Sequence, residues 1–139
     1  MAVVTPNAVK KAIYTALKSD LGVVAVMGSG IKDTYAPEGT AYPFFTYMLT
    51  SLPDSSNWDA DKADVTFTVT AWSDSTSLAE AGTMIAAADA ALRGPGVKLQ
   101  DPDATLAPFS VKRMGMGGAI LAENVVNYTV TYQGFVHGR

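Results

Sequence analysis

Hydrophobic residues recur at two different spacings along the chain, and the spacing assigns each stretch to a helix or a strand. Helical spacing follows Thr5 as far as Gly22 and follows Ser77 as far as Arg93. The inward stripes are expected to be Val9, Ile13, Ala16, Leu17 and Leu21 in the first helix and Leu78, Ala81, Ile85, Ala88 and Leu92 in the second. Strict alternation, typical of a half-buried strand, runs from Val65 to Ser73 and within the stretch from Glu123 to His137.

Residues that favour helix ends support these assignments. Thr5 precedes a proline and is expected to be an N-cap. Asp20 is expected to cap a second, short helical turn from Leu21 to Met27. Ser77 and Glu80 have the spacing of a capping box.

Weaker patterns fill the remaining chain. Further strands are expected at Ile31–Tyr35, Tyr42–Leu49, Val97–Leu99 and Phe109–Met114, with a polar, acidic loop from Ser51 to Asp64 and a flexible, glycine-rich loop from Gly115 to Ala122. The order of helix, strands, helix, strands predicts an α+β fold, with an antiparallel or mixed β-sheet and two main helices packed on one face. No internal repeat or linker is visible, so residues 1–139 are expected to form a single domain.

Composition adds an expectation of partners. Charged residues make up 17% of the 139 residues, against about 25% in a typical soluble domain, while hydrophobic residues make up 48%. Because charged side chains normally keep the surface of a monomer hydrated and soluble, a low share of charged residues suggests that partners cover part of the surface. With a net charge of −3, the chain is not expected to have the positively charged surface that binds DNA phosphates, so tight DNA binding is not expected.

The residues that usually carry catalysis are scarce. There is no cysteine, and the single histidine, His137, lies near a chain end that is expected to fray. The acidic loop lacks the glycine and the final glutamate of a calcium loop, and Gly115–Gly118 lacks the Lys-Ser/Thr pair of a phosphate-binding loop. We therefore expect no enzyme activity and no catalytic, cofactor or metal site. The first residues lack a signal-peptide pattern and no apolar run approaches membrane-spanning length, so cytoplasmic folding without membrane contact is expected.

Three groups of residues are candidates for subunit or partner interfaces. They are Trp58, Asp59 and Asp61 in the acidic loop; Thr83, Ala87 and Ala91 on the expected outer face of the second long helix; and Met114, Met116, Ile120 and Leu121 in and beside the glycine-rich loop. Each group has a plainer explanation. The tryptophan is expected to tuck back onto the sheet, the alanines reflect helix propensity, and the apolar loop residues fold over the domain's own core.

The ordered features resemble a known family. They are Gly30-Ile31, Pro37-Glu38-Gly39, Tyr42-Pro43-Phe44-Phe45, the strand that ends in Ala71-Trp72-Ser73, and Leu78-Ala79-Glu80-Ala81 at the start of the helix. In this order, and over nearly the whole chain, they resemble the small tail-terminator (tail-completion) proteins of long-tailed bacteriophages, prophages and gene-transfer particles. The stretch from Gly115 to Ala122 departs from that pattern by being more apolar and richer in glycine.

This resemblance implies a structural virion protein with no cofactor. Its members form a hexameric ring on the end of the finished tail tube, at the head-proximal end, after assembly in the host cytoplasm. The ring stops tube polymerisation and offers a surface to the head-tail connector protein, and DNA passes through its lumen without tight binding. The alternatives are another connector, neck or tail-tube ring protein, or a small ligand-binding α+β domain.

Overall fold

The computed structural model describes residues 4–51, 62–74, 78–94, 97–103, 106–120 and 125–138. In chain order the elements are α1 (Pro6–Ser19), α2 (Leu21–Val26), β1 (Ile31–Asp33), β2 (Phe44–Ser51), β3 (Lys62–Ser73), α3 (Ala79–Arg93), β4 (Val111–Ile120) and β5 (Val126–His137). Between α3 and β4, an isolated bridge joins Leu99 to Phe109 within the same segment, and a second bridge, Leu106 with Gly138, ties that segment to the residue after β5.

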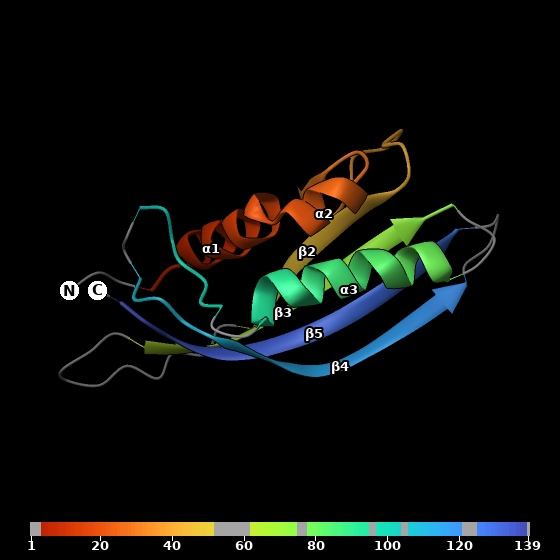
Figure 1. Cartoon of the computed structure of the whole chain (residues 1–139). Helices are drawn as coiled ribbons and strands as arrows, with labels where there is room; N and C mark the ends of the chain where they lie inside the picture. The colour runs from red at the N-terminus through yellow and green to blue at the C-terminus, as the bar shows by residue number, and fades with distance from the viewer. Residues whose placement is uncertain are drawn as a thin grey trace.

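The five strands form one mixed sheet in the order β1-β2-β3-β5-β4. β1 runs parallel to β2, and the other three neighbouring pairs are antiparallel. Figure 1 shows the helices gathered on one side of the sheet, with α3 lying over β3 and β5. The α+β fold with a mixed sheet and two main helices on one face is therefore confirmed.

The core lies between the helices and the sheet. Along β3 every second residue, from Ala63 to Ser73, is buried, while the residues between them are half-buried. The rings of Phe67 and Tyr132 stack at 5.3 Å between β3 and β5. The helices meet them with fully buried side chains that include Val9, Ile13, Leu17, Ala81, Ile85, Ala88 and Leu92. The expected inward stripes are confirmed except at Leu21, which is 85% exposed because the chain turns at Asp20 and Leu21 begins a new helix.

The helix starts follow the expected chemistry. Thr5 Oγ1 accepts a hydrogen bond from the Ala8 backbone N–H at 3.2 Å, and Asp20 Oδ1 accepts one from the Val23 N–H at 3.1 Å. Ser77, the first residue of the expected capping box, lies outside the described residues. Glu80 accepts a hydrogen bond from the Ser73 hydroxyl at 2.6 Å and so ties the end of β3 to the start of α3.

The flexible loop expected from Gly115 to Ala122 is wrong over Gly115 to Ile120, while residues 121 and 122 lie outside the described residues. Gly115 to Ile120 instead continue β4, paired with β5 from Val126 to Thr131. Glycine weakens a strand but does not forbid one, and here a twelve-residue partner strand supplies the ladder. Lys62 to Asp64, expected in the acidic loop, begin β3, and His137 ends β5 as an exposed residue.

Candidate interaction surfaces

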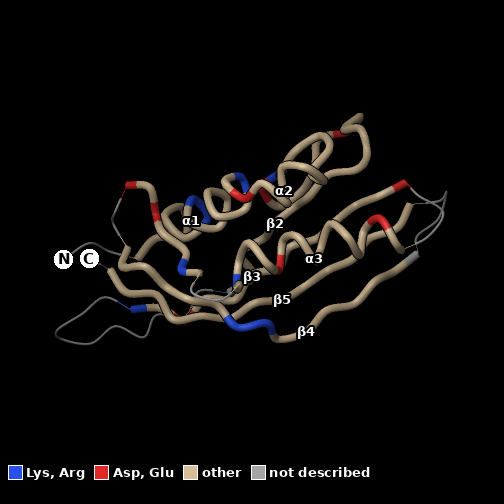
Figure 2. The backbone as a smooth tube through the Cα atoms, in the orientation of Figure 1, with Lys and Arg blue, Asp and Glu red and all other residues tan. Residues whose placement is uncertain are grey.

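The middle of the sheet surface opposite the helices is the first candidate, and we call it the open face. It consists of Phe44, Thr46 and Met48 of β2, Thr66, Thr68, Thr70 and Trp72 of β3, and Asn127, Thr129, Thr131 and Gln133 of β5. None of these side chains is charged, and six carry hydroxyl groups. Figure 2 marks few charged positions along the described middle of the sheet. The open face is thus an uncharged patch in which Phe44 and Thr46 are themselves buried. Charged residues border it on the same side of the sheet: Lys32 of β1, Lys62 and Asp64 of β3, and Lys112 of β4.

The side chains of the open face are held in place by one another. The Thr70 and Thr129 hydroxyls lie 3.1 Å apart across β3 and β5. Trp72 Nε1 donates a hydrogen bond of 2.9 Å to Thr46 Oγ1. The Trp72 ring stacks on Phe44 at 6.2 Å, and Phe44 stacks on Tyr42 at 5.2 Å. These contacts fix rotamers, so the surface is preorganised.

The β4 edge is the second candidate. Every residue from Lys112 to Ala119 is exposed, including Met114 at 51% and Met116 at 43%. The ladder is irregular between Arg113 and Gly115, which leaves Met114 outside the regular pairing. Two glycines leave room beside the strand, since a Cβ at Gly115 or Gly117 would meet no atom within 4 Å. A Cβ at Gly118 would lie 3.1 Å from Leu78 and Tyr128, so that position faces the helices.

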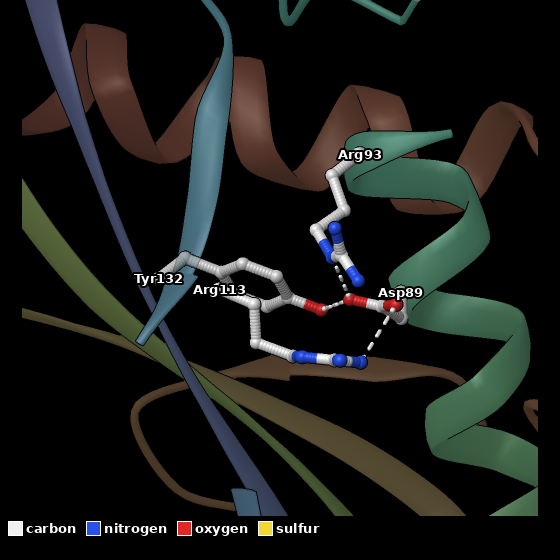
Figure 3. Close-up of polar contacts among 4 residues, drawn as sticks. All are labelled: Asp89, Arg93, Arg113 and Tyr132. Atoms are coloured by element: carbon white, nitrogen blue, oxygen red, sulfur yellow. Dashed lines mark hydrogen bonds and ion pairs between the residues drawn. The ribbon is translucent and has the colours of Figure 1, made fainter. Parts of the chain in front are cut away.

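A polar cluster around Asp89 fixes β4 and β5 to α3 (Figure 3). The half-buried Asp89 carboxylate accepts hydrogen bonds from Arg93 Nε at 2.8 Å, Arg113 at 3.2 Å and the Tyr132 hydroxyl at 2.8 Å. Burial, followed by the hydrogen bond to Asp89, raises the pKa of Tyr132 well above its usual value of 10. Asp89 and Arg113 also line a shallow groove beside α3, but both oxygens of the carboxylate already accept hydrogen bonds. We assign the cluster the structural role of anchoring the start of β4.

The outer face of α3 differs from the one expected. Thr83 is exposed, and its hydroxyl donates to the Ala79 carbonyl oxygen at 3.0 Å. Ala87 is half-buried against the core, and Ala91 is only 6% exposed. The expected outward orientation of Ala91 is wrong because α1 and α2 pack beside α3 and widen its buried arc. The exposed small residues of α3 are Ala79, Thr83, Ala86 and Ala90.

The other expected interface residues are only partly placed. Trp58, Asp59, Asp61 and Leu121 lie outside the described residues, and of Ile120 only the backbone position at the end of β4 is described. Met114 and Met116 are exposed, but on a strand edge instead of in a loop. Sequence reasoning missed the open face as a site, although the alternation of threonines with buried residues in β3 could have revealed it.

Small-molecule sites have little support among the described residues. An open groove of about 500 Å³ lies between α2, the Pro43 turn and the start of α3, and its lining is mostly apolar. Its carboxylate, Glu80, is already bonded to Ser73. In the ranges that the structure describes, no three acidic or histidine side chains gather as a metal site. None of the described helices is long and apolar enough to cross a membrane.

Comparisons with known proteins agree with a tail component. The family described as "Tail completion protein gp17" matches residues 11–117. No curated protein matches the chain. Among solved structures, a chain from the "Virion of native gene transfer agent (GTA) particle" is 20% identical and superposes with a TM-score of 0.78, covering 95% of this chain and 96% of its own. At that identity the superposition shows a shared fold, whereas the family match spans most of the sequence. The chain therefore belongs to the tail completion protein family.

Proposed function

We propose that this protein forms a ring on the head-proximal end of the tail tube, stops tube polymerisation and presents the surface to which the head joins. The observation that carries the proposal is the tail completion family match over residues 11–117. That match supports the coarser part, a structural component of a virion tail. We propose in addition that the ring is a hexamer and that its two partners are the tail-tube protein and the head-tail connector protein.

The mechanism requires shape and no covalent chemistry. A tube subunit at a growing end presents the same surface that accepted it, so addition is open-ended until a different protein covers that surface. A cap needs one face that fits the tube and another that does not. The described surfaces suit this role, because they offer an exposed strand edge and an uncharged patch in the middle of the sheet.

In the proposed ring the open face lines the lumen through which DNA passes. A channel for DNA must not hold phosphates, and a row of lysines or arginines would do so. The open face carries hydroxyl and amide groups but no cation, from Thr66 to Trp72 and from Asn127 to Gln133. The lysines on the same side of the sheet, Lys32, Lys62 and Lys112, lie outside this patch, at the edge strands and at the start of β3. Its side chains are also braced by the Thr70–Thr129 contact, which limits what they can reach toward a passing strand. The net charge of −3 adds weak repulsion of DNA.

The proposed function is tested by removing the gene from a particle-producing strain. The expected result is that heads and tails are both made but remain unjoined, and that the tails are abnormally long in electron micrographs. Joined particles with tails of normal length would contradict the proposal. Overlong tails should regain normal length when the intact chain is supplied from a plasmid.

The alternatives give different results with the purified protein or in the deletion strain. A tube subunit would polymerise into long tubes, and a connector protein would leave tails of normal length but unjoined when its gene is removed. A small ligand-binding domain would remain a monomer, and its melting temperature would rise with ligand. Isolated rings in negative stain would favour the cap.

A further inference from the structure

We propose that the β4 edge of one copy pairs with the β1 edge of the next copy, so that the sheet continues from subunit to subunit around the ring. This inference rests on the proposed function, because it names the contact that closes that ring. It commits to one occupant of the β4 edge, a second copy of this chain. The contact is heterologous, since two different edges of the molecule meet, and such contacts generate rings when the rotation closes.

The first observation is the openness of β4. Its ladder partner is β5 on one side, and it ends the sheet on the other side. Natural proteins usually protect a long edge with charges, proline or a covering segment. Here the stretch from Met114 to Ile120 has no charged residue and no proline, and every residue from Lys112 to Ala119 is exposed. The basic residues Lys112 and Arg113 lie at the start of the strand.

The second observation is a complementary edge on the far side of the same sheet. The Gly30 carbonyl accepts from the Phe45 N–H at 2.9 Å, and the Thr34 N–H donates to the Tyr47 carbonyl at 2.7 Å. Because backbone groups alternate along a strand, those of Ile31 and Asp33 point away from β2. The Asp33 carbonyl accepts from Tyr35 at 2.7 Å, which leaves both Ile31 groups and the Asp33 N–H for a neighbouring strand.

Strand direction and register fit the two edges together. β1, β2 and β5 run one way while β3 and β4 run the other, so β4 meets a neighbour's β1 antiparallel. The register also defines one row of paired residues across all five strands: Lys32, Thr46, Thr70, Thr129 and Gly117. A second copy placed alongside, with its helices on the same side, therefore brings its Lys32 opposite Gly117 without sliding along the strands.

The glycines of β4 suit this approach. Gly117 and Gly115 present no side chain on the sheet side opposite the helices, and the space beside each is open. A neighbouring backbone can therefore come close without a clash. Met114 and Met116 are exposed beside the same stretch and can cover the new contact, since methionine adapts to irregular surfaces.

The absence of cysteine from the chain makes the pairing directly testable. Residues directly opposite in an antiparallel pair have Cβ atoms about 4.5–5.5 Å apart, close to the spacing that a disulfide needs. The variant with both Lys32→Cys and Gly117→Cys should therefore form, on mild oxidation, a ladder of covalent multimers that ends in a closed species and is reversed by reductant. Replacing Gly117→Cys by Gly115→Cys or Ala119→Cys, with Lys32→Cys kept, covers a slide of two residues in either direction.

Two controls make the result specific. Gly117→Cys alone should give no cross-link, and a dimer from that single variant would show β4 pairing with β4 and overturn the proposal. Thr68→Cys combined with Gly117→Cys should give no ladder, because Thr68 lies in the middle of the sheet.

The test is run on the concentrated free protein and on the protein bound to tail tubes. Absence of a ladder from all three cysteine pairs in both settings would also overturn the inference. If six-fold rings are then still seen by electron microscopy, the ring closes through another surface and the proposed function stands. If the ladder forms but deletion of the gene leaves tails of normal length, the proposed function fails and the contact stands.

Discussion

The hydroxyl of Tyr132 on β5 donates a hydrogen bond of 2.8 Å to Asp89 Oδ1 on α3, across the interface between sheet and helix. The same carboxylate accepts from Arg93 and Arg113. Asp89→Ala should lower the free energy of unfolding by about 1–3 kcal/mol, because three donors lose their acceptor at once. The exposed Lys11–Asp103 pair provides a matched control, and Asp103→Ala should change stability little. Urea unfolding followed by circular dichroism measures both; equal effects would contradict the anchoring role.

Two buried tyrosines predict loss of stability at high pH. Burial, with a smaller contribution from Asp33, raises the pKa of Tyr47 to about 12, and burial with the bond to Asp89 raises the pKa of Tyr132. The unfolded chain ionises its tyrosines near pH 10, while the folded chain keeps these two protonated. The contribution of these two tyrosines should therefore be constant below pH 10, and stability should fall as the pH rises from 10 toward 12. Tyr47→Phe should weaken that fall, as measured by unfolding at a series of pH values.

Neighbouring alanines on α3 should respond in opposite ways to the same substitution. Ala91 is 6% exposed, so Ala91→Glu would bury a carboxylate and should cost about 3 kcal/mol or more. Ala90 is exposed, and Ala90→Glu should change the free energy of unfolding by less than about 0.5 kcal/mol. Thermal melts of the two variants decide the matter, and similar melting temperatures would contradict the burial of Ala91. Any loss of ring formation in Ala91→Glu alone would then reflect unfolding.

Two adjacent glycines of β4 should likewise differ. Gly118→Ala places a methyl group 3.1 Å from Leu78 and Tyr128 and should cost about 1 kcal/mol. Gly117→Ala meets no atom within 4 Å and restricts the unfolded chain, so it should be neutral or stabilise by about 0.5 kcal/mol. Chemical unfolding of both variants measures the difference. A larger loss of stability from Gly117→Ala than from Gly118→Ala would contradict the placement of Gly118 against the helices.

Positive charge on the open face should interfere with DNA passage. Thr68 and Thr131 lie opposite each other in the middle of that face. With both residues replaced, Thr68→Lys and Thr131→Lys, the protein should still fold and cap tails, but particles should deliver DNA less efficiently because phosphates are held in the lumen. Thr68→Ser with Thr131→Ser is the matched control. Normal DNA delivery by the lysine variant would contradict the proposal that the open face lines the lumen.

The sequence predicted the elements whose signals are local. Thr5 and Asp20 cap helices as expected, and the alternation from Val65 to Ser73 gave β3 its correct buried side. It failed where the partner in space decides. The glycines of β4 favour a loop by propensity, and β5 overrides that preference. Ala91 could not be placed from helical spacing alone, because the packing of α1 and α2 against α3 widens the buried arc.

The candidate surfaces were predicted less completely than the fold. Met114 and Met116 were singled out from their apolar character, and both are exposed, but the edge strand that presents them depends on the sheet order. Thr83 is exposed as expected. The open face was not proposed, because threonine, asparagine and glutamine along a strand carry no functional motif until the bare side of the sheet is known.

The one-sided placement of the helices separates two kinds of evolutionary constraint. Residues such as Phe67 and Ile85 are fully buried, so substitutions there act on folding. Thr68 and Thr131, on the other side of the same strands, contribute little to the core and can vary with whatever passes over or lies against them. A chain built this way can change the residues on one side of its sheet while keeping its architecture. The gene-transfer-particle chain shares this architecture with a TM-score of 0.78 although only 20% of the residues are identical.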